Sequence, residues 1–154
     1  MRIRQATLDD VATILSLMRG YYRDDELDFD VDRATSTLTR LLVEPQWGNV
    51  YLFEVDAVAV GYLAICVGFS LELGGNDAYI DELFVLPEHR GRGYARQGVA
   101  EVALQLSRSG IRALHLEVDR GNEAAQQLYG ALGFERRDRY FIMTKLLASD
   151  RAPG

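Results

Sequence analysis

The stretch "YIDELFVLPEHRGRGYARQG", residues 79–98, decides the fold that we predict for this chain. Its first half is apolar enough for a strand that is covered on both faces of a sheet. Gly91 and Gly93 then favour a tight turn, and from Ala95 onward the apolar residues recur at helical spacing. Because the strand-like segment 112–118, "RALHLEV", follows that helix, the whole region predicts a βαβ unit.

The turn in this unit is suited to an anion. The first N–H groups of a helix have no partners inside it, so a helix that begins here would direct them at phosphate oxygens. Arg90, Arg92 and Arg96 could add charge-assisted hydrogen bonds, although a solvated basic turn is the simpler alternative. A dinucleotide fingerprint counted from Gly91 would need glycine where Arg96 stands, and no Lys-Ser or Lys-Thr pair follows for a triphosphate loop.

The length, composition and net charge of the chain limit which class of protein it can be. The chain has 154 residues, 48% of them hydrophobic, which predicts one domain over residues 1–147 and a frayed tail at 148–154. Its 17 basic and 23 acidic residues give a net charge of −6, which argues against a nucleic-acid partner. No apolar run approaches the roughly 20 residues of a membrane helix, and the amino terminus lacks a signal-peptide core, so we expect a cytoplasmic protein without a membrane partner.

The remaining residue types predict no other chemistry. Cys66 is the only cysteine and lies in an apolar run, so a buried thiol is expected rather than a nucleophile. With only two histidines in the chain, we expect no metal site.

Hydrophobic periodicity predicts the other elements. Thr7 is the expected cap of a first helix, and Gly110 ends the helix of the βαβ unit. The segment 68–77 is expected to be a loop or an irregular hairpin, and the acidic segment 21–32 is expected to be a loop. The remaining predictions are helices at 33–44 and 122–134, and strands at 1–6, twice within 49–67, and at 139–147.

Two segments together resemble a known family. The spacing Arg90-x-x-Gly93-x-Ala95 resembles the coenzyme A pyrophosphate signature, [QR]-x-x-G-x-[GA], of the GNAT superfamily of N-acetyltransferases. "NEAAQQLYGALGF", residues 122–134, is similar to the family's N-x-x-A-x-x-L-Y-x-x-x-G-F segment, and the element order extends the resemblance to residues 1 to about 147. It implies an α/β (α+β) domain in which about four helices flank a mixed sheet of six to seven strands, with acetyl-CoA as cosubstrate.

The central strand carries a second indication. Apolar residues occupy Ala78 and Ile80 and then Leu83 and Val85, so the two-residue period shifts by one place next to Glu82. A β-bulge there would explain the shift. In relatives, such a bulge separates this strand from the next and exposes backbone groups to coenzyme A.

The resemblance implies the residues that bind coenzyme A. A backbone N–H of Phe84 or Val85 would meet the developing oxyanion. Asn122 would contact coenzyme A, or otherwise only cap the last helix. The full set implied is Leu83, Phe84, Val85, Arg90, Gly91, Arg92, Gly93, Tyr94, Ala95, Asn122 and Tyr129.

Acetyl transfer to an amine needs a base and an acid. An amine with a pKa near 10.4 must lose a proton before it attacks, and a carboxylate lowers that barrier. Glu82, Glu117 and Glu72 are candidate bases; family members use either of the first two positions, and the bulge favours Glu82 slightly. Tyr129 is the candidate acid, with a core tyrosine as the alternative.

The acceptor is indicated by the acidic segment, which in relatives borders the acceptor site. We expect Tyr21, Tyr22, Asp25 and Glu26 to bind a cationic substrate such as a polyamine, an aminoglycoside or a basic peptide end. A solvated loop is the alternative for this segment, and a non-catalytic acyl-CoA sensor is the alternative for the whole domain. The resemblance also makes a homodimer possible.

Overall fold

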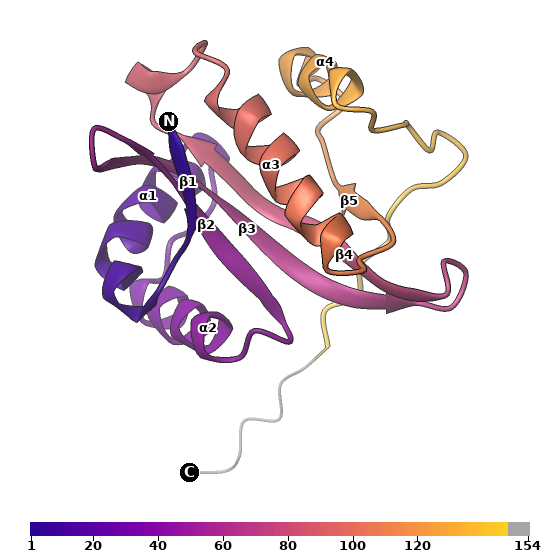
Figure 1. The fold of residues 1–154 in the computed structure, drawn as a ribbon, viewed down its shortest axis with the longest axis horizontal. Helices are drawn as coiled ribbons and strands as arrows, with labels where there is room; N and C mark the ends of the chain where they lie inside the picture. The colour runs from indigo at the N-terminus through magenta and orange to yellow at the C-terminus, as the bar shows by residue number, and fades with distance from the viewer. Residues whose placement is uncertain (148–154) are drawn as a thin grey trace.

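The structure, a computed structural model, describes residues 1–147, so the predicted tail at 148–154 lies outside the described residues. One mixed sheet runs through the centre with its strands in sequence order (Figure 1). All neighbouring strands are antiparallel except β4 and β5, which are parallel. The strands are β1 (Arg2–Gln5), β2 (Gly48–Val55), β3 (Val58–Ser70), β4 (Gly75–Val85) and β5 (Leu114–Leu116).

Helices cover both faces of this sheet (Figure 1). On one face, α1 (Val11–Asp24) and α2 (Val31–Val43) enclose a core that includes Ile14, Leu38 and Phe84. On the other, α3 (Tyr94–Arg108) and α4 (Glu123–Ala131) pack on a second core. The predicted βαβ unit is therefore β4, α3 and β5.

The first helix begins as the sequence predicts. Thr7 and Asp10 form a capping box around a short 3₁₀ turn, Leu8–Asp10, which leads into α1. The Arg4 guanidinium donates to Asp10 at 2.7 and 2.8 Å and to the Glu54 carboxylate at 2.7 Å. Because this guanidinium stabilises the ionised form, it holds the pKa of Asp10 well below its usual range. The network ties β1 and the start of α1 to β2.

The predicted β-bulge lies in β4. Glu82 pairs with Ala64 of β3 and Ile80 pairs with Ile65, which leaves Asp81 as the extra residue. The parallel ladder to β5 covers only Ala78 to Ile80 and stops just before the bulge. The prediction is confirmed, and β4 and β5 separate from this point on.

Three predictions about the elements need correction. The described residues form five strands rather than six or seven, because 139–147 adds no strand: a strand needs a paired ladder, and this segment has none. The segment 68–77 is the hairpin of the two predicted alternatives, but a regular one in which only residues 71–74 lie outside the strands. The acidic segment 21–32 is partly helical, since α1 continues to Asp24 and α2 begins at Val31.

Within residues 1–147, none of the helices combines the length and the apolar character needed to cross a membrane.

Candidate active site

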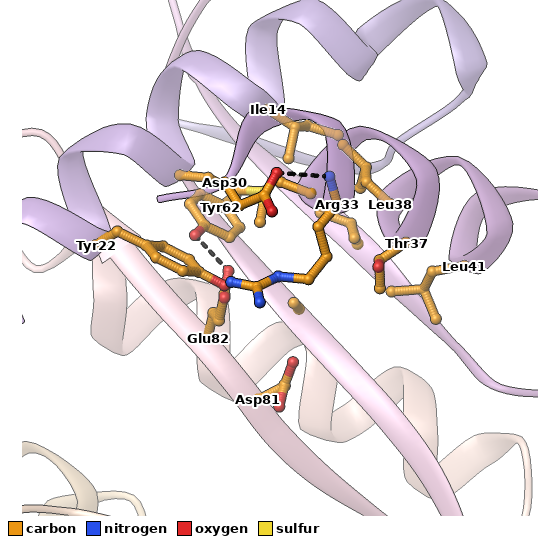
Figure 2. Close-up of a pocket in the computed structure, with 14 residues that line it drawn as sticks. Ile14, Tyr22, Asp30, Arg33, Thr37, Leu38, Leu41, Tyr62, Asp81 and Glu82 are labelled. Atoms are coloured by element: carbon orange, nitrogen blue, oxygen red, sulfur yellow. Dashed lines mark hydrogen bonds between the residues drawn. The ribbon is translucent and has the colours of Figure 1, made fainter. Parts of the chain in front are cut away.

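A pocket of about 280 Å³ lies between α1, α2 and the sheet, and the bulge of β4 opens into it (Figure 2). Asp81 and Glu82 both line this pocket. The neighbouring register pairs Glu82 with Ala64 and Ala64 with Val50, so the strand residues form a row across the pocket floor. The bulge therefore places two carboxylates at one side of this pocket.

Glu82 is the central titratable group of the pocket. The Tyr62 hydroxyl donates to Glu82 Oε2 at 2.6 Å, and the Tyr22 side chain points toward the same carboxylate (Figure 2). Burial raises the pKa of Glu82, the negative charges of Asp81 and Asp25 raise it further, and the tyrosine hydroxyls oppose the rise. A carboxyl whose pKa moves toward neutrality is suited to take and release a proton.

The turn before α3 has the geometry of an anion site. Gly91 and Gly93 have φ of +71° and +78°, in the left-handed region that favours glycine. Helix α3 begins at Tyr94 directly behind them, so its first N–H groups have no partners within the helix. The exposed side chains of Arg92 and Arg96 flank this turn. These features fit a phosphate group.

Arg90 has a different position from the one expected. Its guanidinium donates to the Val85 carbonyl at 2.8 Å and to the Asp24 carboxylate, and it lies over the Phe84 ring at 5.4 Å. These contacts join the end of β4 to α1. The side chain thus supports the strand, while the turn behind it offers backbone N–H groups.

Beyond the bulge, the backbone N–H groups of β4 point alternately toward β3 and away from it. The Leu86 N–H donates to Val60 of β3 at 2.9 Å, and successive strand residues direct their N–H groups to opposite edges. The carbonyl of Phe84 also faces β3, where it approaches Gly61. The N–H groups of Leu83 and Val85 therefore point away from β3, into the gap where β4 and β5 separate.

Comparisons with known proteins identify this arrangement. Residues 11–134 match the acetyltransferase (GNAT) family. The chain belongs to that family. GNAT relatives include an uncharacterized N-acetyltransferase of Methanocaldococcus jannaschii, 27% identical over 138 residues, which cover 88% of this chain and 61% of the relative.

Two further comparisons involve a protein named for its substrate and a structure with a bound analogue. The aminoglycoside N(6')-acetyltransferase type 1 of Salmonella typhimurium is 28% identical over 98 residues, 62% of this chain and 68% of the relative. The fold is similar to that of AAC(6')-Iy in complex with the bisubstrate analogue CoA-S-monomethyl-acetylneamine, at a TM-score of 0.80 and 21% identity, with 95% of this chain and 98% of that chain covered.

The other catalytic candidates of this GNAT domain lie outside the pocket. Glu117 is exposed just beyond the end of β5, and Glu72 lies at the tip of the β3–β4 hairpin, far along β4 from the bulge. Tyr129 lies half-buried on α4, against the α3 core, with its ring 5.5 Å from that of Phe134. Asn122 caps α4, because its side chain accepts from the Ala125 N–H at 3.0 Å.

The four residues predicted to bind the acceptor differ in where they lie relative to the pocket. Tyr22 lines the pocket and packs edge-on against Tyr21, with ring centroids 5.7 Å apart. Tyr21 packs on the α1–α2 core, Asp25 follows the last residue of α1, and Glu26 is exposed with φ of +55°. Of these four residues, only Tyr22 reaches the pocket.

Several pocket residues were not predicted from the sequence. Tyr62 is only 1% exposed, and its hydroxyl within an apolar strand was the one available signal, since a buried tyrosine usually needs a partner. Asp30 and Arg33 at the start of α2 also line the pocket. No local pattern distinguishes them from the other charged residues of the acidic segment.

Proposed function

We propose that this protein transfers an acetyl group from acetyl-CoA to the primary amine of a small cationic or peptidic acceptor, with Glu82 as the base. The observation that carries this proposal is the position of Glu82 at the bulge. Its carboxylate faces a pocket on one side of β4, next to the point where the strand separates from β5.

The anion turn supports acetyl-CoA as the cosubstrate. The unpaired N–H groups at the start of α3 and the exposed Arg92 would hold its pyrophosphate. Bound there, acetyl-CoA supplies an activated acetyl thioester. The separated edges of β4 and β5 lead from this turn toward the bulge, and the coenzyme A analogue on a similar fold supports the same use.

Each step of the transfer is then assigned to a group of this chain. Glu82 accepts the proton of the acceptor ammonium, directly or through water, so that a neutral nitrogen attacks. The Val85 N–H, which points into the gap, donates to the developing oxyanion and is favoured over Phe84, whose backbone faces β3. Tyr129 protonates the thiolate as the carbon–sulfur bond breaks, and the second proton lost by the attacking nitrogen returns through water to the phenolate. Burial raises the pKa of Tyr129, so the phenol is protonated at neutral pH.

A cationic acceptor is supported by the charge around the pocket. Asp30 and Asp81 are exposed at its mouth beside Arg33, the single basic residue among the lining residues, and Asp25 and Glu26 lie on the adjoining segment. This field favours an ammonium ion over a neutral or anionic substrate.

The test is a thiol-release assay over polyamines, aminoglycosides, amino acids, peptides and simple amines, with Glu82→Gln compared with Glu117→Gln. We expect Glu82→Gln to lower kcat by at least about 100-fold, the usual contribution of a general base. Glu117→Gln should stay within about threefold of the parent, and both should bind coenzyme A normally. The reverse ranking would move the base to Glu117, and coenzyme A binding without turnover of any amine would favour the sensor alternative.

A further inference from the structure

The pocket beside Glu82 is polar at its mouth and apolar inside. Four exposed residues form the mouth, namely Asp30, Arg33, Thr37 and Asp81. Tyr22 and Tyr62 also line the pocket, and both side chains point toward Glu82. The remaining interior side chains are buried or half-buried and apolar, namely Ile14, Met18, Ala34, Leu38, Leu41, Val50 and Ala64.

The pairing of the strands shows which residues lead from Glu82 into the apolar interior. Glu82, Ala64 and Val50 are paired neighbours on β4, β3 and β2. A group held at Glu82 would therefore have Ala64 and then Val50 beside it along the floor. Figure 2 shows Ile14, Leu38 and Leu41 on the helices that cover this floor.

Small side chains leave the space open. Ala34 of α2 and Ala64 of β3 both line the pocket, and they are 8% and 6% exposed. The resulting volume of about 280 Å³ is just below the roughly 300 Å³ at which pockets for drug-sized ligands begin. It suits one short chain or ring rather than several hydroxylated rings.

We propose that the interior of this pocket binds the apolar stem of the acceptor, so that the preferred substrate is a primary amine on a linear aliphatic or aryl-alkyl stem. This inference rests on the proposed acetyl transfer and narrows its acceptor. The ammonium group lies at Asp81 and Glu82, and the stem extends over Ala64 toward Val50 and Leu41. A second charge or several hydroxyl groups on the stem would lose their water without gaining partners.

The test compares hexylamine with ethylamine and with 1,6-diaminohexane. Burial of four extra methylene groups should raise kcat/KM of hexylamine over ethylamine by about 30-fold or more. 1,6-Diaminohexane has the same length but a charged far end, and it should be at least about tenfold poorer than hexylamine. Equal values for the three amines, or a preference for the diamine, would overturn the inference.

Substitutions in α2 test where the apolar stem of the acceptor binds. Ala34→Leu fills the interior and should remove most of the advantage of hexylamine over ethylamine in kcat/KM. Ser36→Leu adds the same side chain at an exposed position of α2 and is the matched control. If Ala34→Leu unfolds, Ala64→Val provides the second filling variant. Equal loss for both amines in a folded filling variant would contradict the assignment.

A binding measurement separates this inference from the proposed function. Calorimetric titration of hexylamine, ethylamine and 1,6-diaminohexane into the protein without acetyl-CoA tests the stem alone. Tighter binding of hexylamine, reduced by Ala34→Leu, supports the inference even if no amine is acetylated. Acetylation of all three amines with no difference in binding would support the transfer and refute the stem site.

Discussion

Tyr62 is the side chain that most directly controls the proposed base. Its buried hydroxyl donates to Glu82 at 2.6 Å and stabilises the carboxylate form. Tyr62→Phe removes this donor, so the pKa of Glu82 should rise further. We expect the acidic limb of the pH profile of kcat/KM to move upward by about one unit, since a hydrogen bond to a charged group contributes about 1.5–3 kcal/mol.

The control for this prediction is Tyr51→Phe. Tyr51 is also buried, at 5% exposed, but it belongs to the core on the α3 face of the sheet. Loss of the Tyr51 hydroxyl should leave the acidic limb of the kcat/KM profile in place even if the protein becomes less stable. An unmoved limb in Tyr62→Phe, or equal shifts in both variants, would mean that Tyr62 does not act on the base.

At the scale of elements, the turn of residues 90–93 and the start of helix α3 form the proposed pyrophosphate site. Arg92 is exposed in this turn, and its guanidinium donates only to the Glu88 carbonyl, at 3.2 Å, among the described residues. Arg92→Glu places a negative charge where the pyrophosphate is proposed to bind. The dissociation constant of coenzyme A should rise at least about tenfold, or about 1.4 kcal/mol, by calorimetric titration.

The opposite end of the same helix supplies the control. Arg108→Glu reverses an exposed charge in the last turn of α3, far from the turn at residues 90–93. It should leave coenzyme A affinity within about twofold. An unchanged affinity in Arg92→Glu, with Arg108→Glu equally neutral, would place the pyrophosphate elsewhere.

At the scale of the whole molecule, two carboxyl groups change the stability of the fold with pH in opposite directions. The pKa of Glu82 is raised in the folded state, so this group binds a proton more readily when folded, and its protonation stabilises the fold as pH falls from neutrality. The pKa of Asp10 is lowered, so its contribution is present above the ordinary carboxyl range near 4 and is lost as pH falls below it. Stability should be greatest at mildly acidic pH.

Urea unfolding between pH 8 and pH 3 tests this profile. Glu82→Gln keeps an acceptor for Tyr62 but removes the titration, so the gain in unfolding free energy between pH 8 and pH 5 should shrink. At pH 7 the variant should be more stable than the parent by up to about 1 kcal/mol, a cost that active-site groups commonly impose. If the unfolding free energy of Glu82→Gln depended on pH above pH 5 as steeply as that of the parent, Glu82 would not be the source of this pH dependence.

Local patterns in the sequence account for the part of the fold that holds the anion turn. Glycines in left-handed conformations, a shift in a two-residue period and a helical repeat each depend on residues close together in the chain. The turn, the bulge next to Glu82 and α3 were therefore predictable. The strand predicted at 139–147 was not, because an alternating pattern does not specify a partner for pairing.

The pocket depends on contacts between distant segments. Tyr62 reaches Glu82 across 20 positions of sequence, Arg90 reaches Asp24 across 66, and Ala34 of α2 joins Ala64 of β3 in lining one space. Periodicity assigns each of these residues to a face of its own element but cannot say which faces meet.

The sequence by itself thus determined the βαβ unit, its glycine turn and the bulged strand, because each follows from the conformational preferences of neighbouring residues. Only the tertiary structure decided that Glu82 lies beside Tyr62 at an apolar pocket and that Arg90 supports β4. Packing brings those groups together from separate strands and helices, and it sets the burial that raises the pKa of Glu82.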